Sequence, residues 1–380
     1  MILPNKNIAQ DFVLSNLPRP KSWVAVAVFF MASSALLLML GATDVRSQAS
    51  AKSGSYESYV ASLVESAKKD GKLILYSTHT EEPGVETIGQ MFAKKYPFLN
   101  VEEVMEASNS RLMERMRLEI KAGRSPDIAA IGGGAQAQLK DDGLLGEYTS
   151  PLEEQGLFRA EYESKHHYWT PYAFRTLHNV YNKNIVRAGE LTKDYAAWLN
   201  PKWKRKIGID IGGTFWQWWT AMEKRHGMEK AADFMNKFAD NEPLPFFSNS
   251  QIRNLVAAGE LAFGNYIYLD NILSMQKKGA PLEIWNADPL PFSPSNVSLL
   301  KDAPHPNAAK LFVEFLLAVP VQQERAKKTV VVPVRKDLET PYPQYFTANF
   351  VSVGSDEVRA AETRQRKLYE KFFRVPPQKK

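Results

Sequence analysis

Beyond residue 70 the chain alternates short apolar runs with stretches in which apolar residues recur at helical spacing. The pattern predicts strands at 73–76, 101–105 and 127–131, with helices between them at 85–96 and 110–122. Strand, helix, strand order with crossovers of this length implies parallel pairing in right-handed βαβ units. The first expectation is therefore a doubly wound α/β lobe whose sheet is covered on both faces.

A second α/β series follows a strand-like segment at 177–181. Strands are expected at 206–211, 261–263, 282–285 and 297–300, and helices at 215–225, 229–239, 249–258, 306–317, 321–327 and 356–373. We expect residues 72–174 with 280–335 to form lobe 1, residues 175–279 to form lobe 2, and residues 336–380 to form a C-terminal helical extension. The expected fold class is α/β, with two lobes that are each a covered, mainly parallel sheet and that are joined by crossover strands.

The N-terminal segment has the pattern of an export signal. Residues 23–41 form a run of nineteen without a charge, after Lys6, Arg19 and Lys21 and before small residues at 47–51. This predicts a signal peptide or an uncleaved N-terminal anchor in residues 1–49, then a linker with a short helix at 50–71. Both alternatives export the remainder, because the positive flank stays in the cytoplasm. We therefore expect a periplasmic protein.

Composition removes several classes of function. The 380 residues include no cysteine, which excludes disulfides and Cys-based metal sites. The formal charge of +6, from 48 Lys and Arg against 42 Asp and Glu, is modest and spread along the chain, so we expect no nucleic-acid partner.

Ligands of open parallel sheets bind outside the carboxyl ends of the strands, so the loops at these ends are the first candidates. Their residues are small or polar, which also suits helix caps and turns. The candidates in the first half are Ser77, Thr78, His79, Ser108, Asn109, Gly133 and Gly134. Those in and after the crossover are Tyr172, Arg175, Gly213, Thr214, Phe215, Asn265, Tyr266 and Tyr268.

Motifs for catalysis are weak. The triple glycine at 132–134 lacks both the phosphate-loop ending and the dinucleotide-binding spacing, and there is no zinc-hydrolase or serine-hydrolase signature. Tyr266 and Tyr268 are two apart, so in a regular strand both phenols face the same side. Such a pair can ligate a hard metal, donate hydrogen bonds to an anion, or pack. The aromatic run 215–219 would form a lobe core, with Trp216 directed elsewhere.

Several stretches together resemble the type II extracellular solute-binding proteins of bacterial ABC importers, in the group that includes the ferric-ion-binding proteins. They are Leu73–Thr78, Ser125–Ile128, Asn179–Lys183, Val256–Glu260 and Lys301–Phe312, and the resemblance covers residues 72–335. It implies two α/β lobes, a ligand closed between them, delivery to an inner-membrane permease, a monomer, no catalysis and no cofactor.

The resemblance also implies two alternative ligand sets. Ferric binders of this group use adjacent tyrosines with a His or acidic residue, which here suggests Tyr266, Tyr268, His79 and Glu81, although Ile267 splits the tyrosine pair. Other relatives hold small organic anions, for which Arg175 is the candidate guanidinium unless it forms a salt bridge. The expected function is capture of a small organic anion or ferric ion. An exported enzyme or a sensory accessory protein on the same scaffold stays open.

Overall fold

The computed structural model describes residues 54–78, 85–106, 109–132, 134–159, 167–211, 214–340, 342–343 and 350–373. The chain divides into two compact units, residues 1–58 and residues 59–380, and the fold below is that of the second unit. The apolar segment 23–41, with the export signal expected there, lies outside the described residues. Among the residues described, no helix combines the length and the apolar character needed to cross a bilayer.

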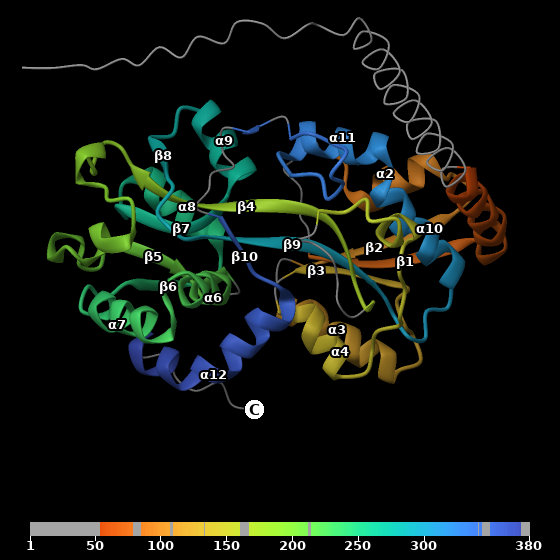
Figure 1. Ribbon diagram of the computed structural model, residues 1–380, viewed down its shortest axis with the longest axis horizontal. Helices are drawn as coiled ribbons and strands as arrows, with labels where there is room; N and C mark the ends of the chain where they lie inside the picture. Colours follow the sequence, from red (N-terminus) through yellow and green to blue (C-terminus); the bar gives the residue numbers. More distant parts are fainter. Residues whose placement is uncertain are drawn as a thin grey trace, which may run out of the picture. The chain divides into compact units, whose positions relative to one another are not determined.

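The first lobe is a parallel α/β unit, as predicted. Its elements are β1 (Lys72–Ser77), α2 (Ile88–Lys95), β2 (Asn100–Met105), α3 (Asn109–Lys121), β3 (Ile128–Gly132), α4 (Ala135–Asp141) and α5 (Pro151–Glu154), joined later by α10 (Pro306–Leu317) and α11 (Val319–Thr329). Strand β1 pairs in parallel with β2 and β3. Helices α2, α10 and α11 lie on one side of these strands, and α3 and α4 on the other (Figure 1).

The second lobe repeats this arrangement. It contains short 3-10 turns η2 (Ala188–Glu190), η3 (Tyr195–Leu199) and η4 (Pro201–Trp203), then β5 (Ile207–Asp210), α6 (Thr214–His226), α7 (Met228–Ala239), β6 (Leu244–Phe246), α8 (Asn249–Ala258), β7 (Phe263–Tyr268), α9 (Leu269–Lys277) and β8 (Leu282–Trp285). Strand β5 pairs in parallel with β6 and β7. The strand expected at 261–263 overlaps β7 only at Phe263, because β7 begins there and runs on through both tyrosines.

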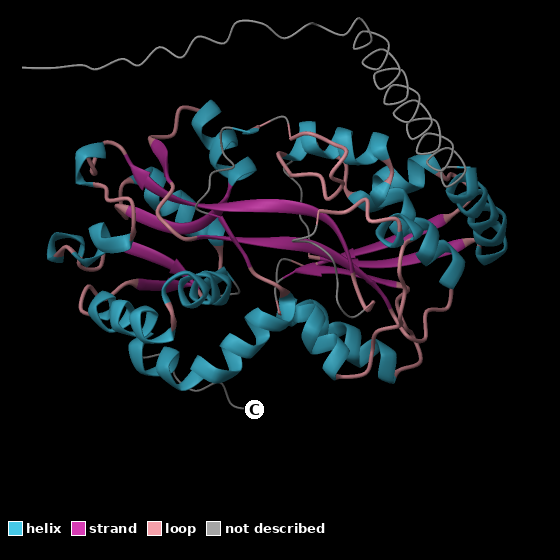
Figure 2. Ribbon diagram, in the orientation of Figure 1, coloured by secondary structure: helices cyan, strands magenta, loops and turns pink. Residues whose placement is uncertain are grey.

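Two long strands, β4 (Thr170–Asn182) and β9 (Leu290–Leu299), run through both lobes (Figure 2). Over residues 170–176, β4 pairs antiparallel with β9, and beyond 177 it pairs antiparallel with β7 and β8. The strand order is β2-β1-β3-β9-β4-β7-β5-β6. The sheet is therefore mixed: the outer strands of each lobe are parallel, as expected, whereas β4 and β9 are antiparallel to each other and to β7, β8 and β3.

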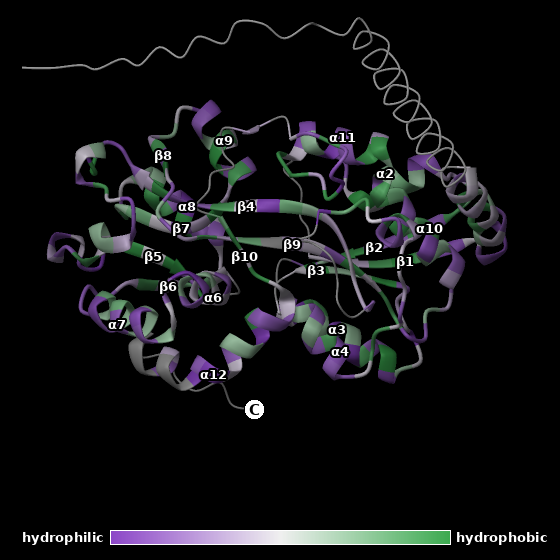
Figure 3. Ribbon diagram, in the orientation of Figure 1, coloured by the Kyte–Doolittle hydropathy of each residue, from purple (hydrophilic) through white to green (hydrophobic). Residues whose placement is uncertain are grey.

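Hydrophobic residues predominate along β1 and β5, which are coloured green in Figure 3. The second lobe has an aromatic core in which Tyr195, Trp198, Phe215, Trp218 and Trp219 are at most 1% exposed. This confirms the core interpretation of the aromatic run. Trp216 is also buried, against a helix at the end of the chain.

The C-terminal segment returns to the joint between the lobes. Strand β10 (Phe350–Ser352) pairs with β9, and α12 (Ser355–Phe373) then begins. The helix predicted at 356–373 is confirmed to within one residue.

Candidate functional site

The carboxyl ends of the first-lobe strands meet at one edge of the sheet. Ser77 ends β1 and is fully buried, and the Thr78 amide donates to the carbonyl of Ala130 in β3 at 3.1 Å. The Asn109 side chain, at the start of α3, donates to the Gly132 carbonyl at 3.1 Å. Sequence reasoning expected Ser77, Thr78 and Asn109 in one region, and the parallel pairing brings them together.

The second lobe presents a matching edge at the ends of β5 and β7. The Thr214 hydroxyl donates to the Asp210 carboxylate at 2.8 Å, and the Asp210 amide donates to Asn265 Oδ1 at 2.9 Å. Asn265 is fully buried, and its Nδ2 has no hydrogen-bond partner in the described part of the chain. A buried donor without a partner costs about 1–3 kcal/mol, so this amide is a candidate contact for a bound solute.

Asp210 was not among the sequence candidates. It is 4% exposed and lies at the last position of β5, two residues before the glycine pair at 212–213. The available signal was a carboxylate at the end of a predicted strand, just before the glycines that open a helix.

Arg175 forms the salt bridge that was one of its two expected roles. Its Nη2 lies 2.6 Å from the Asp270 carboxylate, and the side chains of the pair are only 13% and 12% exposed. The guanidinium also lies over the Tyr268 ring, 4.0 Å from its centroid. Sequence reasoning missed Asp270 because it lies in the first turn of α9, a helix that the pattern did not predict.

Tyr266 does not share a regular strand with Tyr268. Its φ is +50°, in the left-handed region, and the pairing of β4 with β7 shifts register opposite it. The regular strand alternation that would direct the phenols of Tyr266 and Tyr268 to the same side is therefore interrupted.

The Tyr195 hydroxyl donates to the Pro289 carbonyl at 2.8 Å and is hydrogen-bonded to the Tyr266 hydroxyl. Burial raises the pKa of Tyr266 well above its usual value, and burial likewise raises the pKa of Tyr195. Both phenols are accordingly neutral at physiological pH, with their hydroxyls engaged inside the second lobe.

Two other aromatic candidates are core residues in this structure. Tyr172 is fully buried, with the Arg325 guanidinium 5.6 Å from its ring centroid. Phe215 is fully buried among aromatic rings that include Trp218 and Trp219. Gly134 caps α4 with ordinary helical dihedral angles.

Five sequence candidates lie outside the described residues: His79, Glu81, Ser108, Gly133 and Gly213. Within the residues that are described, no three His, Asp or Glu side chains are grouped in a way that could hold a metal ion.

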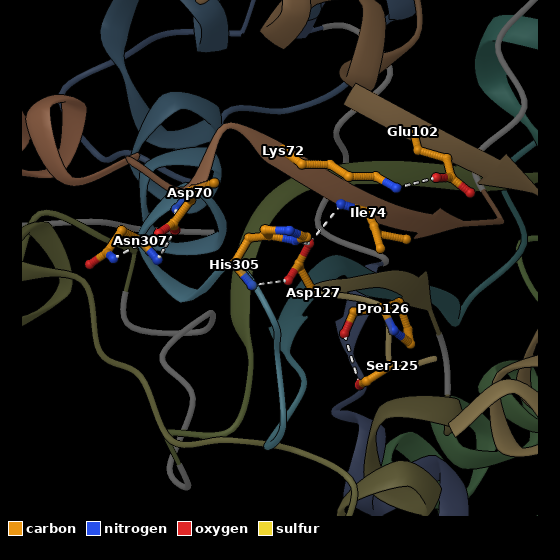
Figure 4. Close-up of polar contacts among 10 residues, drawn as sticks. Asp70, Lys72, Ile74, Glu102, Ser125, Pro126, Asp127, His305 and Asn307 are labelled. Carbon is orange, nitrogen blue, oxygen red and sulfur yellow. Dashed lines mark hydrogen bonds and ion pairs between the residues drawn. The ribbon is translucent and has the colours of Figure 1, made fainter. Parts of the chain in front are cut away.

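The motifs that carried the family resemblance hold the first lobe together (Figure 4). The fully buried Asp127 carboxylate accepts from the Ile74 amide at 2.7 Å, the His305 amide at 2.7 Å and His305 Nδ1 at 2.9 Å. Asp70 accepts from the Asn307 amide at 2.8 Å, at the start of α10. These residues fasten α10 to the start of the sheet, so their role is structural.

Comparison with known proteins gives a relative similar in sequence and solved structures similar in fold. A galactooligosaccharide-binding protein of Bacillus subtilis (strain 168) is 24% identical over 188 residues, which are 48% of this chain and 41% of the relative's length. Iron-bound HitA from Pseudomonas aeruginosa has a TM-score of 0.66 at 20% identity, covering 78% of this chain and 99% of that one. The substrate-binding protein of an ABC transporter from Agrobacterium tumefaciens has a TM-score of 0.68 at 15% identity, covering 80% and 94%.

The solved structures show the two-lobed type II fold of periplasmic binding proteins. A family model described as bacterial extracellular solute-binding protein matches residues 76–323, more than half of the 380 residues. The match runs from the end of β1 to α11 and so includes both strand edges and the two strands that join the lobes. The chain therefore belongs to the bacterial extracellular solute-binding protein family.

Proposed function

We propose that this chain is the exported solute-binding component of an ABC importer, which captures a small ligand between its lobes and delivers it to a membrane permease. The observation that carries the proposal is the pair of polar edges at the carboxyl ends of the parallel strands. One edge offers Thr78 and Asn109, and the other offers Asp210 and Asn265. Proteins of this family are transport proteins without a cofactor, which supports binding rather than catalysis.

Capture would follow the general logic of hinge closure. The lobes share β4 and β9, so a change of dihedral angles in these strands can alter the spacing of the two edges. A solute that touches both edges binds the closed arrangement better than the open one and shifts the population by that difference in affinity.

For the class of solute, we favour an uncharged, hydroxyl-rich molecule over an organic anion. The Arg175 charge is already compensated by Asp270 at 2.6 Å, so an anion would have to displace a buried carboxylate. Burial raises the pKa of Tyr268, Arg175 lowers it, and the nearby carboxylates of Asp210 and Asp270 add to the rise. The Asp210 carboxylate repels anions, whereas it and the Asn265 amide can form hydrogen bonds with sugar hydroxyls. The galactooligosaccharide-binding relative supports the same class.

A thermal-shift screen of the purified full chain tests this proposal. The panel contains neutral galactooligosaccharides, citrate, phosphate and ferric citrate. A specific solute at a hundred times its dissociation constant adds about 2.7 kcal/mol to the free energy of unfolding. We expect the neutral sugars to raise Tm. Asp210→Asn should need at least a tenfold higher sugar concentration for the same rise in Tm.

The matched control is Asp233→Asn, which removes a carboxylate of the same lobe that pairs with Lys237 on the outside of α7. This control should respond like the parent chain. A response to citrate or phosphate alone, lost in Arg175→Met, would replace the neutral solute with an organic anion.

Ferric ion is the second candidate, because the similar HitA structure is described as iron-bound and because Tyr266 and Tyr268 lie in β7. Iron ligation by Tyr266 would require its phenol to leave Tyr195 and lose a proton. A visible charge-transfer band with ferric citrate that disappears in Tyr266→Phe would establish iron instead of a sugar.

The proposal includes a periplasmic location, an N-terminal export signal and an inner-membrane permease as partner. It also includes the lobe limits expected from the sequence, 72–174 with 280–335 for lobe 1 and 175–279 for lobe 2, except that β8 (Leu282–Trp285) is assigned to lobe 2 because it pairs with the second-lobe part of β4. A turnover assay with esters and phosphates separates it from an exported enzyme, which would give product where a binding protein gives none.

A further inference from the structure

The C-terminal helix α12 contacts both lobes. It packs against α6 and α7 of the second lobe and against α4 of the first. Figure 1 shows it running below the strands, from beside α4 to beneath α6 and α7. Sequence reasoning assigned this helix to an extension outside both lobes.

Most of α12 is fixed to the second lobe. The Tyr369 ring lies 5.0 Å from each of the rings of Phe215 and Trp216, in the first turn of α6. Near the other end of α6, Glu223 accepts from Gln365 at 2.7 Å and also binds Arg364. Because these contacts include two buried aromatic rings, α12 should move together with α6.

The first turn of α12 reaches the first lobe. Asp356 lies 3.0 Å from Lys140 at the end of α4, and a Cβ added to Gly134 would meet the Arg359 backbone nitrogen at 3.4 Å. The backbone of α12 therefore lies against the cap of α4 with no side chain between them. The neighbouring Glu357 pairs instead with Lys224 of α6, at 2.8 Å.

The same helix borders the second-lobe edge of the candidate site. Tyr369 is 6% exposed and packs on the first turn of α6, which begins at Thr214. Burial raises the pKa of Tyr369, and the Asp210 carboxylate adds to this effect, so the two side chains lie in one electrostatic neighbourhood. The lobes are thus connected in two separate places, by the shared strands β4 and β9 and by helix α12.

We propose that α12 is a strap between the lobes: it moves with the second lobe, and its first turn holds α4 of the first lobe through Asp356 and the close approach at Gly134. Rotation about β4 and β9 then has to break this contact or remake it. The strap sets how far the candidate edges separate before any solute binds. The inference extends the proposed function, but its test needs no solute and so can fail separately.

The test measures the distance between the lobes by double electron–electron resonance in the full chain without ligand. The chain has no cysteine, so Leu118→Cys on α3 and Met228→Cys at the start of α7 introduce the only two labels. Both parent side chains are well exposed, at 62% and 56%. Removing a lobe-to-lobe contact should move the distance distribution to longer values or broaden it.

Two variants weaken the strap in different ways. Asp356→Asn removes the charge that pairs with Lys140, and Gly134→Val places methyl groups against the α12 backbone at a residue whose φ of −73° accepts any side chain. Their controls are Glu357→Gln, which weakens a pair inside the second lobe, and Gly132→Ala, whose added Cβ meets nothing within 4 Å.

We expect a longer or broader distribution in Asp356→Asn and a larger change in Gly134→Val, with both controls like the parent. Unchanged circular dichroism and Tm within 2–3 °C would show that each variant is folded. A change in either variant with silent controls supports the strap. Parent-like distributions in both variants, or an equal change in Glu357→Gln, would overturn it.

Discussion

His178 is a buried neutral base in β4, one of the two strands that join the lobes. Its Nδ1 lies 2.7 Å from Asn286 Oδ1 and its Nε2 lies 3.0 Å from the Thr176 hydroxyl. The ring is fully buried, and this burial lowers its pKa from 6.5 to about 4, although the hydrogen bond to Asn286 opposes the shift. The protein thus keeps an uncharged imidazole at the joint where a charged one would be costly.

The lowered pKa predicts how the free energy of unfolding depends on pH. Above pH 6.5 His178 is neutral in both states and contributes no pH dependence. Between pH 6.5 and 4 the unfolded chain binds the proton that the folded chain refuses, so stability falls as the pH falls, by about 3 kcal/mol in all. Urea unfolding at pH 7.5, 6, 5 and 4 should show a shallower pH dependence in His178→Gln. The exposed His226→Gln serves as control and should keep the parent slope.

Asp127 is a second buried residue, and its burial determines how much stability is lost when it is replaced. Its carboxylate serves two backbone amides and one imidazole nitrogen, from segments as distant in sequence as Ile74 and His305. In Asp127→Ala the two amides keep their burial and lose their acceptor, which should cost about 2–5 kcal/mol of the free energy of unfolding.

The matched variant for this prediction is Asp70→Ala, which removes a carboxylate cap from the start of α10 and should cost about 1 kcal/mol. Urea unfolding at pH 7.5 gives both values. An equal or larger loss in Asp70→Ala would show that the Asp127 network is not the main fastening of α10.

At the scale of elements, periodicity predicted most of the fold because long amphipathic helices and apolar strands carry a local signal. The helices at 249–258 and 306–317 begin and end where expected. The elements that the pattern did not predict are short, or no turn residue separates them from the preceding element. Helix α4 has seven residues, β6 has three and begins after Pro243, and α9 follows β7 without a turn residue between them.

The candidate site was less predictable than the fold, because its contacts join residues far apart in sequence. Arg175 meets Asp270 across 95 positions, and Tyr266 meets Tyr195 across 71. No local pattern indicates such pairs. The loops at the strand ends could be identified, because parallel pairing places them at one edge whatever their partners are. The left-handed φ of Tyr266 has no local signal either, since tyrosine rarely adopts it.

At the scale of the whole molecule, the Arg175–Asp270 pair lies where the sheet passes from one lobe to the other. Arg175 faces Ser293 of β9 in the pairing register, within the last residues that β4 shares with the first lobe. Asp270 belongs to α9 of the second lobe. The ion pair, with Tyr268 beneath the guanidinium, therefore ties the joining strand to the second lobe at the point where bending would occur.

A double-mutant cycle measures what this pair contributes. Arg175→Met leaves the Asp270 carboxylate in a site that is only 12% exposed, and Asp270→Asn leaves the guanidinium without its carboxylate, so each single change should destabilise the chain by about 2–4 kcal/mol. The double variant removes both charges and should recover at least half of the larger single loss, because no uncompensated charge remains buried. Urea unfolding of the four proteins gives the coupling energy directly. Losses that simply add would mean that the two groups are each held by other partners. An anionic solute would then not have to displace the Asp270 carboxylate, and the argument for a neutral solute would be lost.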